Sequence, residues 1–274
     1  MNKQDELIDL LKSYKSVVVA FSGGVDSSVL AKAAYVALGE NAVAITAKSE
    51  LMTEQEIIDA QNVASLIGIK HHFFTVDDLG DEKFTANDKM RCYHCHINRF
   101  KILEDFCHQH NFNYLLEGSN EDDKGDYRPG MLALKEFPIT KSPFLTLHIT
   151  KNEIRQMAKN WNLPVWNKPS SACLASRVAY GLEITPERLQ QIDEAEQLLK
   201  NIVQGQIRVR HHGNLARIEV EADAISQLFL PKNRELITTK LQELGFTFIT
   251  IDLNGYQKGS TNAALDLSSN STII

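Results

Sequence analysis

The chain has 274 residues, of which 43% are hydrophobic and 23% are charged, a composition typical of a globular protein with a sizeable core. Its 29 Lys and Arg against 35 Asp and Glu give a formal net charge of −6, which disfavours a long polyanion such as nucleic acid and is compatible with a small anionic substrate. No run reaches the roughly 18 apolar residues of a membrane span, and the acidic start resembles no signal or transit peptide, so we expect a cytoplasmic protein without membrane contact.

Residues 16–162 alternate strand and helix patterns. Capping boxes at Thr53 with Glu56 and at Thr150 with Glu153 mark two helix starts. The alternation predicts an α/β fold with a doubly wound, mostly parallel sheet that has helices on both faces. The predicted strands are 16–21, 41–47, 71–76 and 114–117, and the predicted helices are 27–38, 53–67, 95–110 and one from 150 that ends before 164.

After the proline-containing segment 163–169, the pattern becomes that of a smaller α+β domain. Thr185 and Pro186 are typical of an N-cap and a first helical position, which predicts a helix to about residue 200. Strands at 206–212 and 215–221, one helix over about 223–244 and a strand at 246–253 follow. We therefore predict domains over 1–180 and 181–274, the second serving substrate binding or oligomerisation, and we expect a homo-oligomer.

The most informative segment, SGGVDSS at residues 22–28, joins the first predicted strand to its helix. Two glycines allow a sharp turn that brings backbone N–H groups close to an anion, and serines add hydroxyl donors. The positive end of the following helix points at the same place. The segment lacks the Gly-Lys-Ser/Thr ending of a Walker loop and the G-x-G-x-x-G spacing of a dinucleotide-binding fingerprint. The segment therefore predicts a phosphate loop of another class, rather than a plain turn with serine caps.

This segment matches the SGGxDS signature of PP-loop ATP pyrophosphatases, and the chain resembles that superfamily. The resemblance implies an adenine nucleotide α-hydrolase-like fold and cleavage of ATP between its α- and β-phosphates. The loop would bind the leaving pyrophosphate, and Asp26 would help to hold the Mg²⁺ that spreads the developing charge. The residues expected to contact ATP, pyrophosphate or Mg²⁺ are Ser22, Gly23, Gly24, Asp26, Ser27, Ser28, Ala47 and Gly118.

Three later stretches narrow the resemblance. Residues 118–120 with 126–130 follow the fourth predicted strand, at the edge where α/β sheets bind ligands, although alone they also fit an acidic surface loop. Residues 168–181 and 253–260 are the other two. Together they resemble the LarE family of ATP-dependent sulfurtransferases in nickel-pincer nucleotide biosynthesis. The resemblance implies that each carboxylate of pyridinium-3,5-biscarboxylic acid mononucleotide is adenylated, attacked by sulfur and released as a thiocarboxylate.

The strand at 206–212 places Arg208 and Arg210 on one face, and Arg217 and Glu219 share a face on the next strand. One interpretation is a solvated surface with cross-strand ion pairs of little energy. The other is an arginine platform for a phosphate or carboxylate. The substrate residues expected from the pattern and the resemblance are Asp126, Arg128, Ser176, Arg208 and Arg210, and the catalytic residues are Cys173, Asp26 and Arg177.

In a cytosolic chain, cysteines are expected to be metal ligands or reactive thiols rather than disulfide partners. Cys92 and Cys95 form a C-x-x-C pair that, with the distant Cys173, is a ligand set for a [4Fe–4S] cluster with one open iron. A structural zinc at Cys92 and Cys95 with nearby histidines stays open, although the histidine spacing is not that of a finger, as do unliganded thiols. Cys107 lies in an amphipathic helix and is expected to be a core thiol.

The resemblance implies two sources of sulfur. In members with one cysteine, the residue matching Cys173 gives up its own sulfur and becomes dehydroalanine, so each chain acts once. In members with three cysteines, a cluster-bound sulfide attacks the adenylate, and inorganic sulfide or another donor is the partner. A tRNA thiolation enzyme, an ATP-dependent amidotransferase and a nucleotide sensor are the alternatives. The acidic balance and the lack of an obvious RNA-binding module argue against the first, and the lack of a recognisable glutaminase domain argues against the second.

Overall fold

The computed structural model describes residues 2–124, 129–169 and 172–265 and divides the chain into two units. The first comprises Met1–Asp78 and Cys92–Ser171, and the second comprises Leu79–Arg91 and Ala172–Ile274. The segment 79–91 belongs with the second unit because Asn87 Nδ2 donates hydrogen bonds of 2.8 Å to the carbonyls of Ala179 and Leu182. The main boundary in the chain therefore falls between residues 171 and 172, and the segment 79–91 of the second unit interrupts the first. The sequence predicts a single boundary near residue 180.

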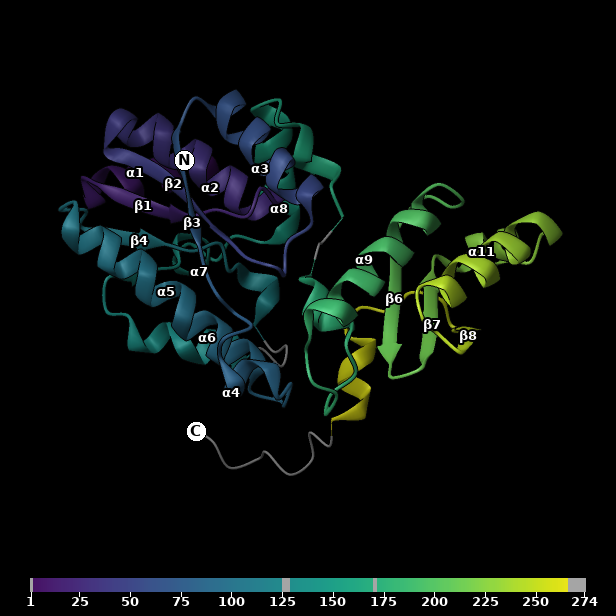
Figure 1. The fold of residues 1–274 in the computed structure, drawn as a ribbon. Helices are drawn as coiled ribbons and strands as arrows, with labels where there is room; N and C mark the ends of the chain where they lie inside the picture. The colour runs from purple at the N-terminus through teal and green to yellow at the C-terminus, as the bar shows by residue number, and fades with distance from the viewer. Residues whose placement is uncertain (1, 125–128, 170–171, 266–274) are drawn as a thin grey trace. The chain divides into compact units, whose positions relative to one another are not determined.

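The first unit is built on a five-stranded, all-parallel sheet with the order β3-β2-β1-β4-β5 (Figure 1). Successive side chains of a strand point to opposite faces, so Val17 and Val19 of β1 join one core cluster and Val18 joins another. The predicted α/β class is confirmed. The strands are β1 (Val17–Ala20), β2 (Ala42–Lys48), β3 (Lys70–Thr75), β4 (Tyr114–Leu116) and β5 (Thr140–Lys141).

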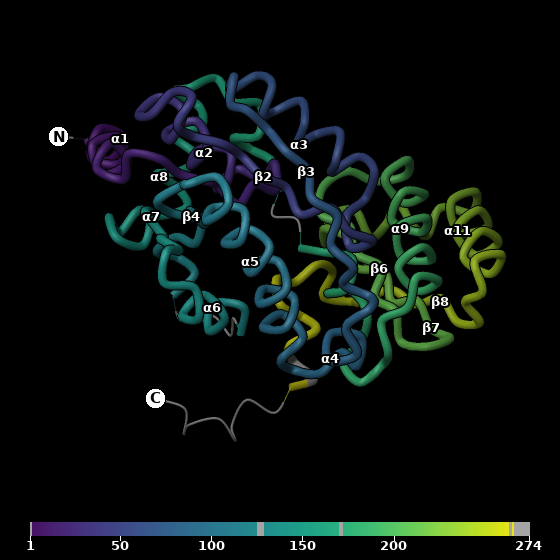
Figure 2. Tube along the Cα trace, turned by 60° about the vertical axis from the view of Figure 1, so that its left-hand side comes forward, coloured from purple at the N-terminus to yellow at the C-terminus, as the bar shows by residue number. Residues whose placement is uncertain are grey.

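Helices cover both faces of this sheet. Apolar residues of α1, α2, α3 and α8 pack with Val17 and Val19, whereas α5 packs with Val18 on the other face (Figure 2). Both predicted capping boxes form, at Thr53 and at Thr150. The helices are α1 (Lys3–Tyr14), α2 (Val25–Leu38), α3 (Glu54–Ile67), α5 (Arg91–Gln109), α6 (Pro129–Ala133), α7 (Pro143–Thr146) and α8 (Lys151–Asn160).

The central strand β1 lies between β2 and β4, so the chain changes direction across the sheet at this point. In open α/β sheets, ligands bind outside the carboxyl ends of the two strands that flank such a switch point. Residues 21–24 leave β1 at that edge, and residues 117–120 leave β4 beside them. The fold therefore places the phosphate loop next to the turn after β4.

The second unit contains a three-stranded sheet in which β7 pairs antiparallel with β6 and parallel with β8. Residues of α9 and α11 pack against it. The single helix predicted over 223–244 is wrong, because Pro231 starts a new helix; proline has no N–H to continue the preceding one. The elements are α4 (Glu82–Thr85), α9 (Pro186–Lys200), β6 (Ile207–His212), β7 (Leu215–Val220), α10 (Ile225–Leu228), α11 (Pro231–Glu243) and β8 (Phe248–Ile251). Within the described ranges, no helix has the length and apolar character needed to cross a membrane.

Candidate active site

The loop between β1 and α2 is an anion cradle braced by its own serines. Gly23 has a φ of +69°, and a Cβ there would lie 2.8 Å from the Cα of Ala60, so only glycine fits. Ser27 Oγ donates to the carbonyl of Gly24 and lies in hydrogen-bond range of the Ser22 N–H, both at 3.2 Å. The helix α2 begins directly after the loop and directs its N-terminus at it. Ser28, another predicted ligand residue, is fully buried beneath the loop.

Asp26, the predicted Mg²⁺ ligand, forms an ion pair with Lys151 of α8. Its Oδ1 also accepts a hydrogen bond of 3.4 Å from Asn120 Nδ2. The side chains of Asp26 and Lys151 are 27% and 26% exposed, so a ligand can reach both. Gly118 lies against this pair, since a Cβ there would be 3.3 Å from the Cβ of Asp26. The structure thus brings Asp26 and Gly118 together.

Lys151 is missing from the sequence-based prediction of the site, and Asn120 entered it only as part of the stretch 118–120, without a role of its own. The sequence does contain a signal for Lys151, which is the first residue of α8. The helix dipole disfavours a cation at this position, so a lysine there indicates a nearby bound anion or carboxylate. For Asn120 the position after the fourth predicted strand indicated the ligand edge, but its contact with Asp26 depends on the approach of β4 to the phosphate loop.

The turn after β4 is held by Glu117, which is 7% exposed. Its Oε2 accepts hydrogen bonds from the Ser119 N–H at 2.8 Å and the Ser119 hydroxyl at 2.6 Å. Burial raises the pKa of the Glu117 carboxyl, and the bonds from Ser119 oppose that rise. Asn120 continues the turn, its N–H donating to Asp123 Oδ2 at 3.0 Å. This network fixes the backbone from which Asn120 reaches Asp26.

A pocket of about 160 Å³ opens beside the phosphate loop, between the ends of β1 and β2 and one face of α5. Ala47, predicted to contact ATP, lines it together with Phe21 and Phe100. Arg99 also lines the pocket, and its Nη2 donates to Asp78 Oδ2 at 2.7 Å and to Ser49 Oγ at 2.8 Å. Apolar walls with an anchored guanidinium, next to a phosphate loop, suit the base of a nucleotide.

None of the four cysteines is in a disulfide. Cys92 and Cys95 lie one turn apart in the first turns of α5, and both are half-buried, as is Cys173 of the second unit. Three such thiols are a donor set of the iron–sulfur and zinc type. No group of three His, Cys, Asp or Glu side chains able to hold a metal ion is gathered in the portion of the chain that the structure describes. Cys107 is fully buried, and burial raises its pKa to about 12, so the prediction of a core thiol is confirmed.

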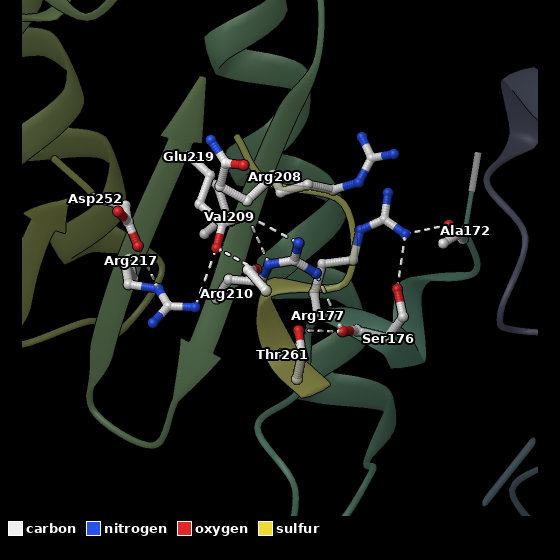
Figure 3. Close-up of polar contacts among 12 residues, drawn as sticks. Ala172, Ser176, Arg177, Arg208, Val209, Arg210, Arg217, Glu219, Asp252 and Thr261 are labelled. Atoms are coloured by element: carbon white, nitrogen blue, oxygen red, sulfur yellow. Dashed lines mark hydrogen bonds and ion pairs between the residues drawn. The ribbon is translucent and has the colours of Figure 1, made fainter. Parts of the chain in front are cut away.

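The second unit buries a group of arginines around two glutamates (Figure 3). Arg210 donates to Glu219 Oε2 from Nε at 3.0 Å and from Nη2 at 2.8 Å. Arg177 donates to Glu196 from Nε at 3.0 Å and from Nη2 at 3.2 Å. Because Glu219 is fully buried and Arg210 is 6% exposed, the interpretation of these strands as a solvated surface is wrong.

Arg208 is the third buried arginine of the group, and its guanidinium lies beside that of Arg177 in Figure 3. Its Nη1 donates to the carbonyl of Ile207 at 2.7 Å, and its guanidinium lies over the ring of Tyr256, 5.3 Å from the centroid. Burial lowers the pKa of Arg208, and the nearby Arg177 lowers it further. A buried cation destabilised in this way is relieved by a bound anion.

Arg177 links this group to the predicted reactive cysteine. Its Nη1 donates to the carbonyls of Ala172 and Cys173, the second at 2.7 Å. The Ser176 hydroxyl donates to the same Cys173 carbonyl at 2.8 Å. Arg177 and Ser176 thus hold the backbone around Cys173 through these hydrogen bonds. The other two predicted substrate residues, Asp126 and Arg128, lie outside the described residues.

One further contact concerns the start of α5. Arg91, the residue before Cys92, donates from Nη1 to the carbonyl of Ala175 at 3.0 Å and to Asn87 Oδ1 at 2.7 Å. Ala175 comes two residues after Cys173 in the chain. Sequence analysis missed both Arg91 and Asn87, since neither belongs to a recognisable motif.

Comparison with known proteins places this geometry in a family. The NAD synthase family matches residues 6–124, which include the phosphate loop and β1 to β4. The chain is 40% identical over 264 residues to an uncharacterized protein of Synechocystis sp., covering 96% of this chain and 98% of that protein. It is 33% identical over 264 residues to the pyridinium-3,5-bisthiocarboxylic acid mononucleotide synthase of Lactiplantibacillus plantarum, covering 96% and 95%. A tRNA-specific 2-thiouridylase of Rickettsia africae is 26% identical over 200 residues, covering 60% and 55%. The chain therefore belongs to the PP-loop ATP pyrophosphatase superfamily and, within it, to the LarE family that includes the Lactiplantibacillus synthase.

Proposed function

We propose that this enzyme of the PP-loop class works in the cytoplasm as an ATP-dependent sulfurtransferase. It activates the carboxylates of pyridinium-3,5-biscarboxylic acid mononucleotide as adenylates and replaces AMP with sulfur, giving the thiocarboxylates of a nickel-pincer nucleotide. The observation that carries the proposal is the 33% identity over 96% of the chain to a synthase of the bisthiocarboxylic mononucleotide. The two sites described above supply what such a reaction needs, a nucleotide site and a buried cationic site beside a cysteine.

In the ATP step, the phosphate loop binds the leaving pyrophosphate through backbone N–H groups, and the pocket with Phe21 and Arg99 takes the base. Asp26 is the residue that would hold Mg²⁺, which neutralises phosphate charge when bound. In the structure Lys151 neutralises Asp26 instead. We propose that the pair opens when the nucleotide binds, leaving Lys151 to neutralise the phosphates. Lys151 thus joins the predicted residues as a further cation of the site.

In the substrate step, Arg208 and Arg210 bind the phosphate of the mononucleotide. Four buried or half-buried arginines (Arg177, Arg208, Arg210 and Arg217) face three carboxylates (Glu196, Glu219 and Asp252), which leaves the group with a positive excess. Arginine guanidinium groups bind phosphate oxygens in pairs, which suits a phosphorylated substrate. Ser176 and Arg177 hold the backbone of Cys173, and Asp126 and Arg128 remain proposed substrate residues.

For the sulfur step, we propose that Cys92, Cys95 and Cys173 hold a [4Fe–4S] cluster, which when bound offers an open iron for a sulfide ligand. Two observations support this set: the three cysteines are half-buried and form no disulfide, and Cys92 and Cys95 are one helical turn apart. Inorganic sulfide or another donor would supply the sulfur. Zinc at Cys92 and Cys95 is the alternative, with Cys173 giving up its own sulfur.

The first test of this proposal is a metal analysis. Iron, acid-labile sulfide and zinc are measured per chain on protein purified and reconstituted without oxygen. We expect about four irons with matching sulfide, lost in Cys92→Ala and retained in the matched control Cys107→Ala. Stoichiometric zinc would contradict the cluster. A metal-free chain that loses one H₂S in mass after one turnover would assign the sulfur to Cys173.

The second test separates activation from sulfur transfer. With ATP, Mg²⁺, sulfide and the biscarboxylic mononucleotide, the parent protein should release pyrophosphate and form the thiocarboxylate, detected by mass spectrometry. Cys173→Ala should bind ATP but form no thiocarboxylate. Normal product from that variant would exclude both sulfur routes. A parent protein that thiolates tRNA but not the mononucleotide would instead support the relationship to the thiouridylase, although the net charge of −6 disfavours RNA.

A further inference from the structure

The segment after β8 is not used by the reaction described above, although it contains one of the motifs that characterise the sequence. We call residues 254–262 the C-terminal strap. The strap runs past the end of β7, where the Tyr256 N–H donates to the carbonyl of Val220 at 2.8 Å. Gly255 has a φ of +65°, and a Cβ there would lie 2.6 Å from the Val220 oxygen. Only glycine fits this approach, so the motif keeps the strap close to the sheet.

The strap contacts the buried arginines from two sides. The ring of Tyr256 lies against the guanidinium of Arg208, 5.3 Å from its centroid. Ser260 Oγ donates to Glu219 Oε1 at 2.7 Å, while Glu219 Oε2 accepts both bonds from Arg210. Glu219 is fully buried, so the hydroxyl of Ser260 helps to satisfy the carboxylate that orients Arg210.

The strap also reaches the segment that follows Cys173. Thr261 Oγ1 donates to the carbonyl of Ser176 at 3.3 Å, and Arg210 Nη1 donates to the same oxygen at 3.3 Å (Figure 3). The Tyr180 hydroxyl and Asn262 Oδ1 are 3.3 Å apart. The strap therefore contacts Arg208, the partner of Arg210 and the backbone before Arg177, all in the second unit.

Building on the proposed function, we propose that the C-terminal strap positions the arginines that bind the phosphate of the mononucleotide. Tyr256 holds Arg208 through the face of its ring, and Ser260 holds Arg210 through Glu219. Each side chain would act through an arginine, Tyr256 directly on Arg208 and Ser260 through Glu219 on Arg210, so both are positioning residues. An arginine held in place before the substrate arrives loses less conformational freedom on binding, which raises the affinity for the anion.

The experiment measures the Kd of the biscarboxylic mononucleotide by calorimetric titration, together with the KM for ATP. Tyr256→Leu removes the ring face and is expected to weaken mononucleotide binding about five- to tenfold. Tyr256→Phe retains the face and should restore the affinity. Ser260→Ala is expected to weaken binding about threefold to tenfold. Leu253→Ala, at a side chain that is 89% exposed just before the strap, is the neutral control. The KM for ATP should not follow the mononucleotide affinity.

A double variant tests whether Tyr256 acts through Arg208. In an Arg208→Ala background, Tyr256→Leu should cause no further loss of affinity. Additive losses, or folded single variants that bind as tightly as the parent, would overturn the positioning role while leaving the proposed function intact. A parent protein that binds ATP but not the mononucleotide would overturn both the proposed substrate and this role. Thermal unfolding of each variant identifies any change that only reflects lost folding.

Discussion

The buried carboxylate of Glu219 gives a sharp test of how the second unit is stabilised. It is fully buried and accepts four hydrogen bonds, two from Arg210, one from Arg217 at 3.0 Å and one from Ser260. Glu219→Gln keeps the shape but replaces one acceptor oxygen by a donor, so at least one arginine loses its acceptor. Arg210, at 6% exposure, then stays buried without its negative partner. Removing one partner of a buried pair costs about 3–5 kcal/mol, and we expect a loss near the lower end.

The assay must report on the second unit alone. Both tryptophans, Trp161 and Trp166, lie in the first unit, so tryptophan fluorescence reports on that unit. Hydrogen exchange of the β6 and β7 amides reports on the second, and a loss of about 3 kcal/mol should speed it roughly hundredfold. The matched control is Glu243→Gln, because the Lys240–Glu243 pair is 51% and 56% exposed and should contribute below about 1 kcal/mol. Equal, small effects from both variants would refute the reasoning.

Three further predictions concern the ATP site and the response to pH. Asp26→Asn should lose Mg²⁺-dependent pyrophosphate release. Lys151→Met should weaken the binding of ATP and pyrophosphate about tenfold, while the affinity for AMP is unchanged. If calorimetry shows that AMP binding weakens equally, Lys151 does not belong to the pyrophosphate site. Burial lowers the pKa of His211 to about 4, and its Nε2 pairs with Gln191 Oε1 at 2.9 Å. As pH falls below about 6.5, the imidazole of His211 is protonated in the unfolded chain before it is protonated in the folded one. The free energy of unfolding therefore decreases between about pH 6.5 and about pH 4. Urea unfolding at several pH values should show a smaller drop in His211→Gln, and an unchanged drop would contradict the assignment.

Local patterns predicted a large part of this protein. Alternating strand and helix patterns predicted the α/β class, the two capping boxes started their helices at the expected residues, and Cys107 is buried as its helix pattern indicated. These features depend on residues within one or two turns of each other, so local sequence patterns are enough to predict them. The break at Pro231 is also local, because proline cannot continue the preceding helix, and the long helix predicted across it was wrong.

The partners of the residues in the two sites depend on contacts between distant parts of the chain. Lys151 reaches Asp26 across 125 residues of chain, and Asn120 reaches it across 94, because β1, β4 and α8 converge at one edge of the sheet. The alternation of 206–212 indicated which residues share a face but not whether that face is covered. Its burial depends on Ser176, Arg177 and the C-terminal strap, which approach from distant parts of the chain.

The sequence by itself determined the phosphate loop and the class of the fold, because the order Ser-Gly-Gly-Val-Asp-Ser after an apolar strand has a chemistry that needs no tertiary partner. The family followed from the resemblance of this segment and of three later stretches. Only the tertiary structure decided that Asp26 is paired with Lys151 and that the arginines of β6 are buried around Glu196 and Glu219. Burial and ion pairing are properties of what packs against a residue, and the packing partners are set by the fold rather than by the neighbouring residues in the chain.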